Sequence, residues 1–194
     1  YQEIRIDSTP AWRSYPILNG GAFAGAIAGF DIDFWCVDVN NYIHAGDVYF
    51  ANVIPLGDWD DATEAQVRKG TVTSWKDGAD FSALERYQMA AYLVETYSNF
   101  PDGPASDATL DANTQKTIWN LLFPASFSGT VPAATTSIRN AAVNALALNP
   151  SLGLGRWAVV SGVALDAAGL LSSSDRRQTF IVRLDDTPVP EPAT

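Results

Sequence analysis

Hydrophobic and polar residues alternate over positions 30–38, which read FDIDFWCVD. In an extended strand, this alternation places the side chain of Cys36 with the apolar residues on one face and Trp35 on the other. A turn and a second apolar segment at 48–56 follow, so we predict a β-hairpin with Cys36 directed toward the core. The preceding segment 20–29 is rich in Gly and Ala and predicts a loop or an irregular edge strand.

Three segments with the periodicity of amphipathic helices come next. We predict helices over 81–97 (with Asp80 as N-cap), 111–122 and 134–148, and then strands over 156–163 and 178–184. Strands on both sides of a helical block predict an α+β fold: a β-sandwich or barrel-like body with a helical subdomain inserted at about 80–149. One domain would cover 1–184, and the proline-rich segment 185–194 is expected to be a linker.

The 194 residues carry a net charge of −10 and are 47% apolar, enough to build the core of one domain. A surface of this charge repels phosphate groups, so no nucleic acid is expected as a partner. No segment reaches the roughly 20 apolar residues that a membrane span requires. The chain begins with Tyr1 rather than Met, so we expect that processing or trimming has removed the start, and a secretory signal is a natural candidate. Its single cysteine excludes an internal disulfide.

Three acidic residues, Asp58, Asp60 and Asp61, lie close together in the chain. Carboxylates at this spacing can bind calcium, but these lack the ligand pattern and the glycine of a calcium-binding helix–loop–helix. A solvated acidic loop explains them better, and we predict no metal ion. The glycines of 20–29 lack the strand-to-helix context of a phosphate-binding loop, and no cofactor is expected.

Gln115 shares one face of the predicted helix 111–122 with Trp119 and other apolar residues. A carboxamide buried without partners costs about 1–3 kcal/mol, so it must be hydrogen-bonded or used chemically. Cys36 also lies on an apolar face, where a cysteine is usually a small hydrophobic residue. If the strand and the helix pack together, the thiol of Cys36 can displace ammonia from the carboxamide of Gln115 and form a thioester. On these residues alone, the structural and the reactive interpretations both stay open.

Two short motifs resemble those of bacterial surface thioester domains, the TQXA domains. The first, Phe34-Trp-Cys-Val-Asp38, is similar to the aromatic–Cys–hydrophobic motif of that family. The second, Thr114-Gln-Lys-Thr-Ile-Trp119, is similar to its Thr-Gln-x-Ala-Ile-Trp motif, with Thr117 in place of the alanine. The resemblance covers about 30–123 and implies a β-rich body that carries a helical subdomain.

This resemblance implies a thioester between Cys36 and Gln115 on an exported domain that acts as a covalent adhesin. Cys36 would be the leaving thiol, and the carbonyl carbon of Gln115 would form an amide with an amine on a protein lysine or an amino sugar. Such a reaction happens once per molecule, so the protein would not be an enzyme. Trp35 and Trp119 could shield the bond from water, and His44 is a candidate base for the attacking amine.

The last six residues, VPEPAT, resemble the start of a PEP-CTERM sorting signal. This resemblance implies export by a Gram-negative bacterium that produces exopolysaccharide, a membrane segment beyond the present sequence, and display on the cell surface or in the extracellular matrix. Two other functions stay open. A non-covalent matrix or carbohydrate-binding module would keep Cys36 as a free thiol, and a hydrolase would use a Cys36–His44 dyad or paired carboxylates.

Overall fold

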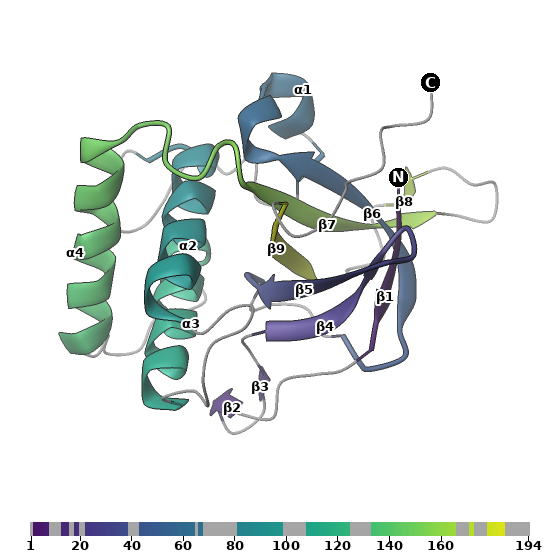
Figure 1. Ribbon diagram of the computed structural model, residues 1–194, viewed down its shortest axis with the longest axis horizontal. Coiled ribbons are helices and arrows are strands. Elements are labelled where there is room, and N and C mark those ends of the chain that lie inside the picture. The colour runs from purple at the N-terminus through teal and green to yellow at the C-terminus, as the bar shows by residue number, and fades with distance from the viewer. Residues whose placement is uncertain are drawn as a thin grey trace.

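The architecture comes from a computed structural model. The structure describes residues 2–7, 13–15, 18–19, 22–38, 43–64, 66–67, 81–98, 108–124, 133–165, 171–172 and 178–184. The segment 185–194, expected to be a linker with a sorting motif, lies outside these residues. A β-barrel and a packed helical subdomain make up the described part, which confirms the predicted α+β class with a helical insertion (Figure 1).

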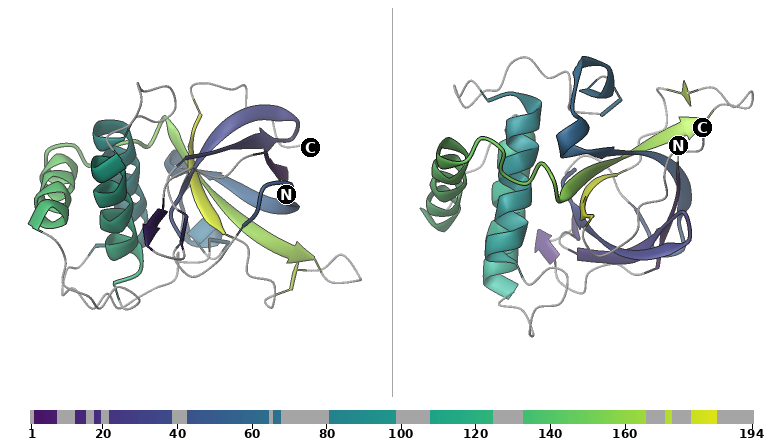
Figure 2. Two further views of the ribbon diagram at one scale, coloured as in Figure 1. Left: turned by 90° about the horizontal axis from the view of Figure 1, so that it is seen from below. Right: turned by 45° about the horizontal axis from the view of Figure 1, so that its top comes forward.

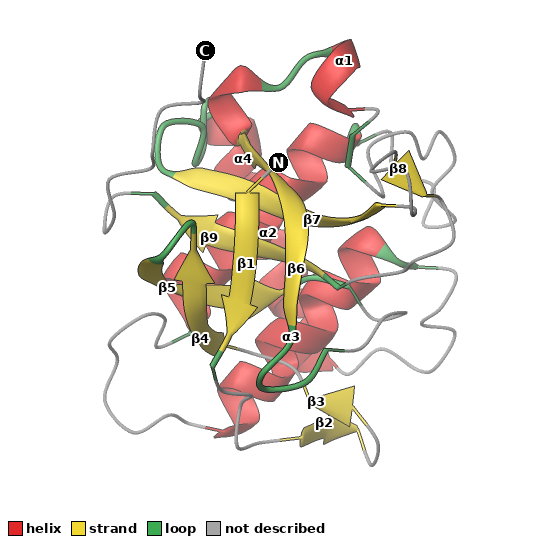
Figure 3. Cartoon of the chain, turned by 90° about the vertical axis from the view of Figure 1, so that its right-hand side faces the viewer, coloured by secondary structure: helices red, strands yellow, loops and turns green. Residues whose placement is uncertain are grey.

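Six antiparallel strands form a closed barrel (Figure 3). Around the barrel they are β1 (Gln2–Ile6), β4 (Ala22–Ile27), β5 (Phe30–Cys36), β9 (Thr179–Arg183), β7 (Trp157–Leu165) and β6 (Val48–Pro55). Because β6 pairs with both β7 and β1, the ring closes and none of these strands is an edge strand. Three short strands lie outside the ring: β2 (Arg13–Tyr15) pairs with β3 (Leu18–Asn19), and β8 (Leu171–Ser172) pairs with the end of β7.

The predicted hairpin between the strands at 30–38 and 48–56 is wrong. β5 pairs with β4 and β9, whereas β6 pairs with β1 and β7. A tight turn at Ala28 and Gly29 joins β4 to β5, and these two residues have positive φ values of 49° and 85°. Two successive positive φ values give a hairpin turn whose twist matches that of the paired strands. β4 therefore occupies an edge of β5 that the prediction had given to β6.

The segment 20–29 contains a barrel strand, so the expected loop or irregular edge strand is also wrong. β4 lies between β1 and β5 and pairs with both. Its small residues allow a close approach of β1, because a Cβ atom on Gly25 would lie 2.1 Å from the carbonyl oxygen of Arg5. The glycine at this position therefore allows the backbones of β1 and β4 to pack closely.

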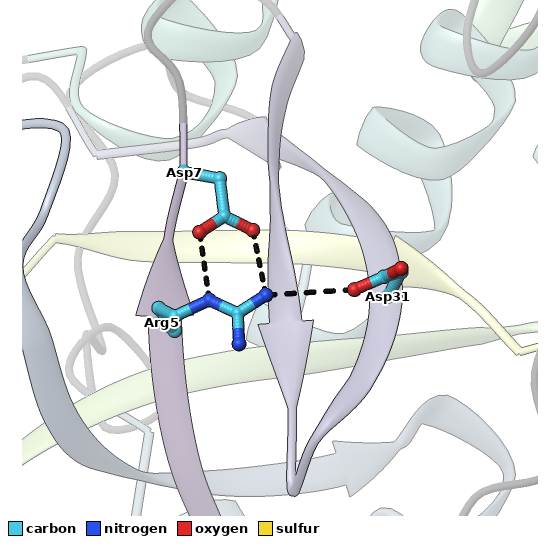
Figure 4. A network of polar contacts seen from close by, with 3 residues as sticks. All are labelled: Arg5, Asp7 and Asp31. Atoms are coloured by element: carbon cyan, nitrogen blue, oxygen red, sulfur yellow. Dashed lines mark hydrogen bonds and ion pairs between the residues drawn. The ribbon is translucent and has the colours of Figure 1, made fainter.

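A polar cluster lies on the outer wall of the barrel, across β1, β4 and β5 (Figure 4). Arg5 donates two hydrogen bonds to the carboxylate of Asp7, at 2.7 and 2.9 Å, and its guanidinium lies 3.5 Å from Asp31. The hydrogen bonds from Arg5 hold the pKa of Asp7 below its usual value. All three side chains are exposed to solvent, so these contacts add little stability and belong to the surface.

Three helices are inserted between β6 and β7: α2 (Ala83–Tyr97), α3 (Ala108–Leu122) and α4 (Ala133–Leu148). Two short helical turns, η1 (Leu56–Asp58) and α1 (Asp61–Glu64), precede them. The N-cap of α2 is Ser82 rather than the predicted Asp80, because Ser82 and Glu85 form a reciprocal capping box. Figure 2 shows α2 and α3 between the barrel and α4. None of the described helices is long and apolar enough to cross a membrane.

Two apolar clusters meet at β5. One fills the barrel and includes Phe34 and Cys36, and the other lies between the barrel and the helices and includes Trp35. The predicted division of this strand into two faces is therefore confirmed, although both faces are buried at its C-terminal end. α3 contributes Ile118 to the helical cluster and Trp119 to the barrel cluster. The side of α3 that carries Trp119 thus reaches the barrel interior in which Cys36 lies.

Candidate functional site

The thiol of Cys36 lies in the barrel interior at the end of β5. The residue is 0% exposed, and across the sheet it pairs with Phe180 of β9. Its Sγ donates a hydrogen bond of 3.5 Å to the carbonyl oxygen of Asp38, a residue that is also buried. The single cysteine of the chain is thus held in a closed site rather than displayed on the surface.

Gln115 lies on α3 and is also 0% exposed. Its side-chain Nε2 donates a hydrogen bond of 2.8 Å to the backbone carbonyl oxygen of Cys36, although the two residues are 79 positions apart in the chain. The structure therefore places together the two residues that the sequence motifs single out. An amide hydrogen bond to the backbone satisfies one buried donor, as the structural interpretation of Gln115 also requires.

Two tryptophans border this site. Trp119, one helical turn after Gln115, is 1% exposed and packs in the barrel cluster with Cys36. Trp35 is 2% exposed and packs on the opposite face of β5, in the helical cluster. Both tryptophans are buried, but only Trp119 packs in the same cluster as Cys36, and the expected shielding of a thioester stays a prediction.

Two threonines of the second motif are buried and hydrogen-bonded. Thr117, which stands where the thioester family usually has alanine, donates its hydroxyl to the carbonyl oxygen of Asn113 at 2.7 Å. A threonine thus fits this buried position, because its polar atom is satisfied within the helix. Thr114 donates to the carbonyl oxygen of Tyr97 at 3.2 Å and so attaches α3 to the C-terminal end of α2.

Gln178 is a residue of this site that the sequence analysis missed. It immediately precedes β9, is 4% exposed, and places its side-chain Nε2 at 2.6 Å from Sγ of Cys36 and at 3.3 Å from the carbonyl oxygen of Asp38. A weak signal was present: Gln178 is two positions before Phe180 and therefore on the same strand face. That signal has meaning only once β9 is known to pair with β5.

The surroundings of Cys36 favour an uncharged sulfur. Burial raises the pKa of the Cys36 thiol to about 12, and the nearby charge of Asp38 contributes to the rise. Hydrogen bonds with the Asp38 backbone and with the side chains of Trp119 and Gln178 partly offset this effect. A thiol or a thioester carries no charge and suits the site, whereas a resting thiolate does not.

His44 and the acidic residues at 58–61 lie apart from these buried groups. The side chain of His44 is 84% exposed, with Nδ1 3.8 Å from a carboxylate oxygen of Asp47 in the same turn. Its imidazole lies on the surface and does not join the buried groups around Cys36. Asp60 caps the short helix α1 through Thr63, and the described residues hold no group of His, Cys, Asp and Glu side chains arranged to bind a metal ion.

No protein-family model, curated protein or solved structure matches the chain.

Proposed function

We propose that Cys36 and Gln115 form an internal thioester, and that the protein uses this bond to attach itself covalently to amines. The observation that carries the proposal is the hydrogen bond from the Gln115 amide to the backbone carbonyl oxygen of Cys36 at a fully buried junction of strand and helix. A thiol and a primary amide are the two groups that a thioester requires. Support also comes from the raised pKa of the thiol, because a neutral thioester avoids placing charge in this site.

Formation of the bond is a balanced exchange of leaving groups. The sulfur of Cys36 attacks the side-chain carbonyl carbon of Gln115, the carbon–nitrogen bond breaks, and the amide nitrogen leaves as ammonia after taking up the thiol proton. The second step consumes the bond: a neutral amine attacks the same carbon, the carbon–sulfur bond breaks, and Cys36 regains a proton that the amine releases. The product is an amide between Gln115 and the target, so each molecule reacts once.

The closed site explains how such a bond would survive in water. Trp119 and Trp35 are buried at this junction and would keep water from the bond, so its hydrolysis would be slow. The bond would then persist until an amine reaches it. A net charge of −10 attracts cationic surfaces, such as those rich in lysine or amino sugars, and raises the local concentration of amines. We propose an exported adhesin that acts on such surfaces or in an exopolysaccharide matrix.

The two other functions receive less support from the described residues. A carbohydrate-binding module would present aromatic rings to sugars. Trp35, Trp119 and Trp157 are each at most 2% exposed, although Phe30 and Phe50 are 43% and 44% exposed. A Cys–His hydrolase would need a reactive thiolate near an imidazole, whereas Cys36 has a raised pKa and His44 lies on the surface.

Incorporation of a labelled amine tests the proposed reaction. Wild-type protein is incubated with a fluorescent primary amine and then analysed under denaturing, reducing conditions, beside the variants Cys36→Ala and Gln115→Ala. We expect stable labelling of the wild type and of neither of these two variants. Gln88→Ala is a matched control, because Gln88 is 2% exposed and donates to the carbonyl oxygens of Pro150 and Leu152, and it should label like the wild type. Equal labelling of wild type and Cys36→Ala would refute the proposal.

A further inference from the structure

Asp38 is a carboxylic acid buried at the same end of the barrel as the Cys36 thiol. The extended backbone of β5 continues past Cys36, because the backbone N–H of Val37 donates to the carbonyl oxygen of Thr179 at 3.1 Å. Side chains two positions apart in an extended chain lie on the same face, so the side chain of Asp38 is on the face that carries Cys36. The residue is 1% exposed, and its backbone carbonyl oxygen accepts hydrogen bonds from Cys36 Sγ at 3.5 Å and from Gln178 Nε2 at 3.3 Å.

The charge of this carboxylate acts on the sulfur. Burial is the main cause of the raised pKa of the Cys36 thiol, and the negative charge of Asp38 is the next. A fixed negative charge in this place opposes the departure of the sulfur as a thiolate. A carboxylate that accepts a proton and then returns it to the sulfur removes this conflict, because its charge is neutralised while the sulfur leaves.

We propose that Asp38 is the proton carrier of the thioester reaction, whose carboxylate takes a proton from the attacking amine and passes it to the sulfur of Cys36. This inference rests on the proposed function. It holds for either carboxamide as the source of the acyl carbon, because Asp38 acts on the amine and on the sulfur. Both carboxamides are near: Nε2 of Gln115 donates to the backbone carbonyl oxygen of Cys36 at 2.8 Å, and Nε2 of Gln178 lies 2.6 Å from Sγ.

The reaction with an amine requires such a carrier. A neutral amine gains positive charge when its nitrogen bonds to the acyl carbon, and it must then lose a proton. The carboxylate of Asp38 takes that proton, the carbon–sulfur bond breaks with its electron pair moving to Sγ, and Asp38 gives the proton to the sulfur. The products are an amide, a free thiol and an ionised Asp38. His44, the only histidine of the chain, is 84% exposed in its side chain and lies apart from these groups.

Asp38→Asn separates this role from a purely electrostatic one. The asparagine keeps the shape of the side chain but cannot accept the proton. General base catalysis contributes about a hundredfold to ten-thousandfold in rate, so the variant should incorporate methylamine more slowly by a factor in this range. If Asp38 acts only as a charge beside the sulfur, the same substitution should instead speed the reaction, because the leaving thiolate is then opposed less.

Two controls accompany this variant. Asp111→Asn removes another buried carboxylate, which is 5% exposed in the first turn of α3, and it should react with methylamine like the wild type. The second control is a different nucleophile, the thiolate of 2-mercaptoethanol, which has no proton to lose when it attacks. Asp38→Asn should exchange with this thiolate at least as fast as the wild type. Intact mass measures the one-ammonia deficit and both additions, and thermal denaturation confirms that each variant is folded.

Slow reaction of Asp38→Asn with methylamine, but not with 2-mercaptoethanol, supports the inference. A folded Asp38→Asn protein without a thioester supports it if Asp38→Glu, which restores a carboxylate, forms one, and overturns it if that variant forms none. Reaction with methylamine at the wild-type rate or faster, or equal slowing with both nucleophiles, overturns it and leaves the proposed function intact. Asp38→Ser replaces Asp38→Asn in these assays if the latter does not fold. Wild-type protein with no thioester refutes the proposed function itself.

Discussion

If Cys36 and Gln115 form the proposed thioester, replacing Trp119 by alanine is expected to expose it to water. Trp119 is 1% exposed and packs with Cys36 in the barrel interior, one helical turn from Gln115. Its removal leaves a cavity beside the bond, and a cavity lined by thiol, amide and backbone groups can admit water. The variant should therefore lose its thioester by hydrolysis and carry free Cys36 and Glu at position 115.

Trp157→Ala provides the matched control. Trp157 is also 1% exposed, but it packs in the helical cluster rather than in the barrel interior. Truncation of a buried tryptophan to alanine costs about 3–5 kcal/mol, so both variants should lose a similar share of their stability. The free energy of unfolding of small domains is about 5–15 kcal/mol. The folded population of both variants should therefore still dominate at low temperature.

The assay combines chemical denaturation with intact mass measured over time after purification. We expect similar losses of unfolding free energy in the two variants, but loss of the one-ammonia mass deficit only in Trp119→Ala. If both variants keep the deficit, Trp119 is not the barrier to water. If both lose it at the same rate, general instability rather than local shielding controls hydrolysis, and the reasoning fails.

Three further predictions concern the thiol and the fold. In Gln115→Ala, where Cys36 stays a free thiol, the unfolding free energy should fall as pH rises from the ordinary thiol pKa of 9.0 toward about 12. The reason is that the unfolded chain loses the proton first, and the slope should approach about 1.4 kcal/mol per pH unit relative to the double variant Cys36→Ala/Gln115→Ala. Gly25→Ala should destabilise the barrel by about 1–3 kcal/mol in chemical denaturation, because its Cβ would meet the Arg5 carbonyl oxygen at 2.1 Å, and an unchanged midpoint would contradict this contact. Ser82→Ala should lose about 1 kcal/mol of unfolding free energy, and no loss would argue against the capping box.

The helices were predictable because their information is local. Apolar spacing located all three within three residues at each end, and α4 (Ala133–Leu148) differs from its prediction by one residue. The N-cap of α2 was misplaced by two residues because Asp80 and Ser82 are both good caps. The structure selects Ser82, whose partner Glu85 completes the capping box.

Strand pairing was not predictable in the same way, since it depends on contacts between distant segments. The hairpin of 30–38 with 48–56 follows from closeness in sequence, yet β4 takes one edge of β5 and β9 takes the other. β4 itself was missed because residues such as Gly25 indicate flexibility in a sequence, while here they allow two backbones to approach.

The site was only partly predictable, because some of its residues lie in local motifs and another joins it through strand pairing. Cys36 and Gln115 were found because each lies in a short motif, and their contact required only that one strand pack on one helix. Gln178 lies in no motif and joins the site through the pairing of β9 with β5. A polar residue beside a strand in the sequence carries no sign of the sulfur that it will contact.

Intact mass of freshly purified protein under non-reducing conditions is the most direct test of the Cys36–Gln115 thioester. We expect a mass below the calculated value by one ammonia, and the addition of one methylamine on treatment with that amine. Cys36→Ala and Gln115→Ala should show neither the mass deficit nor the addition. A full calculated mass, together with quantitative alkylation of Cys36 after unfolding, would contradict the central claim.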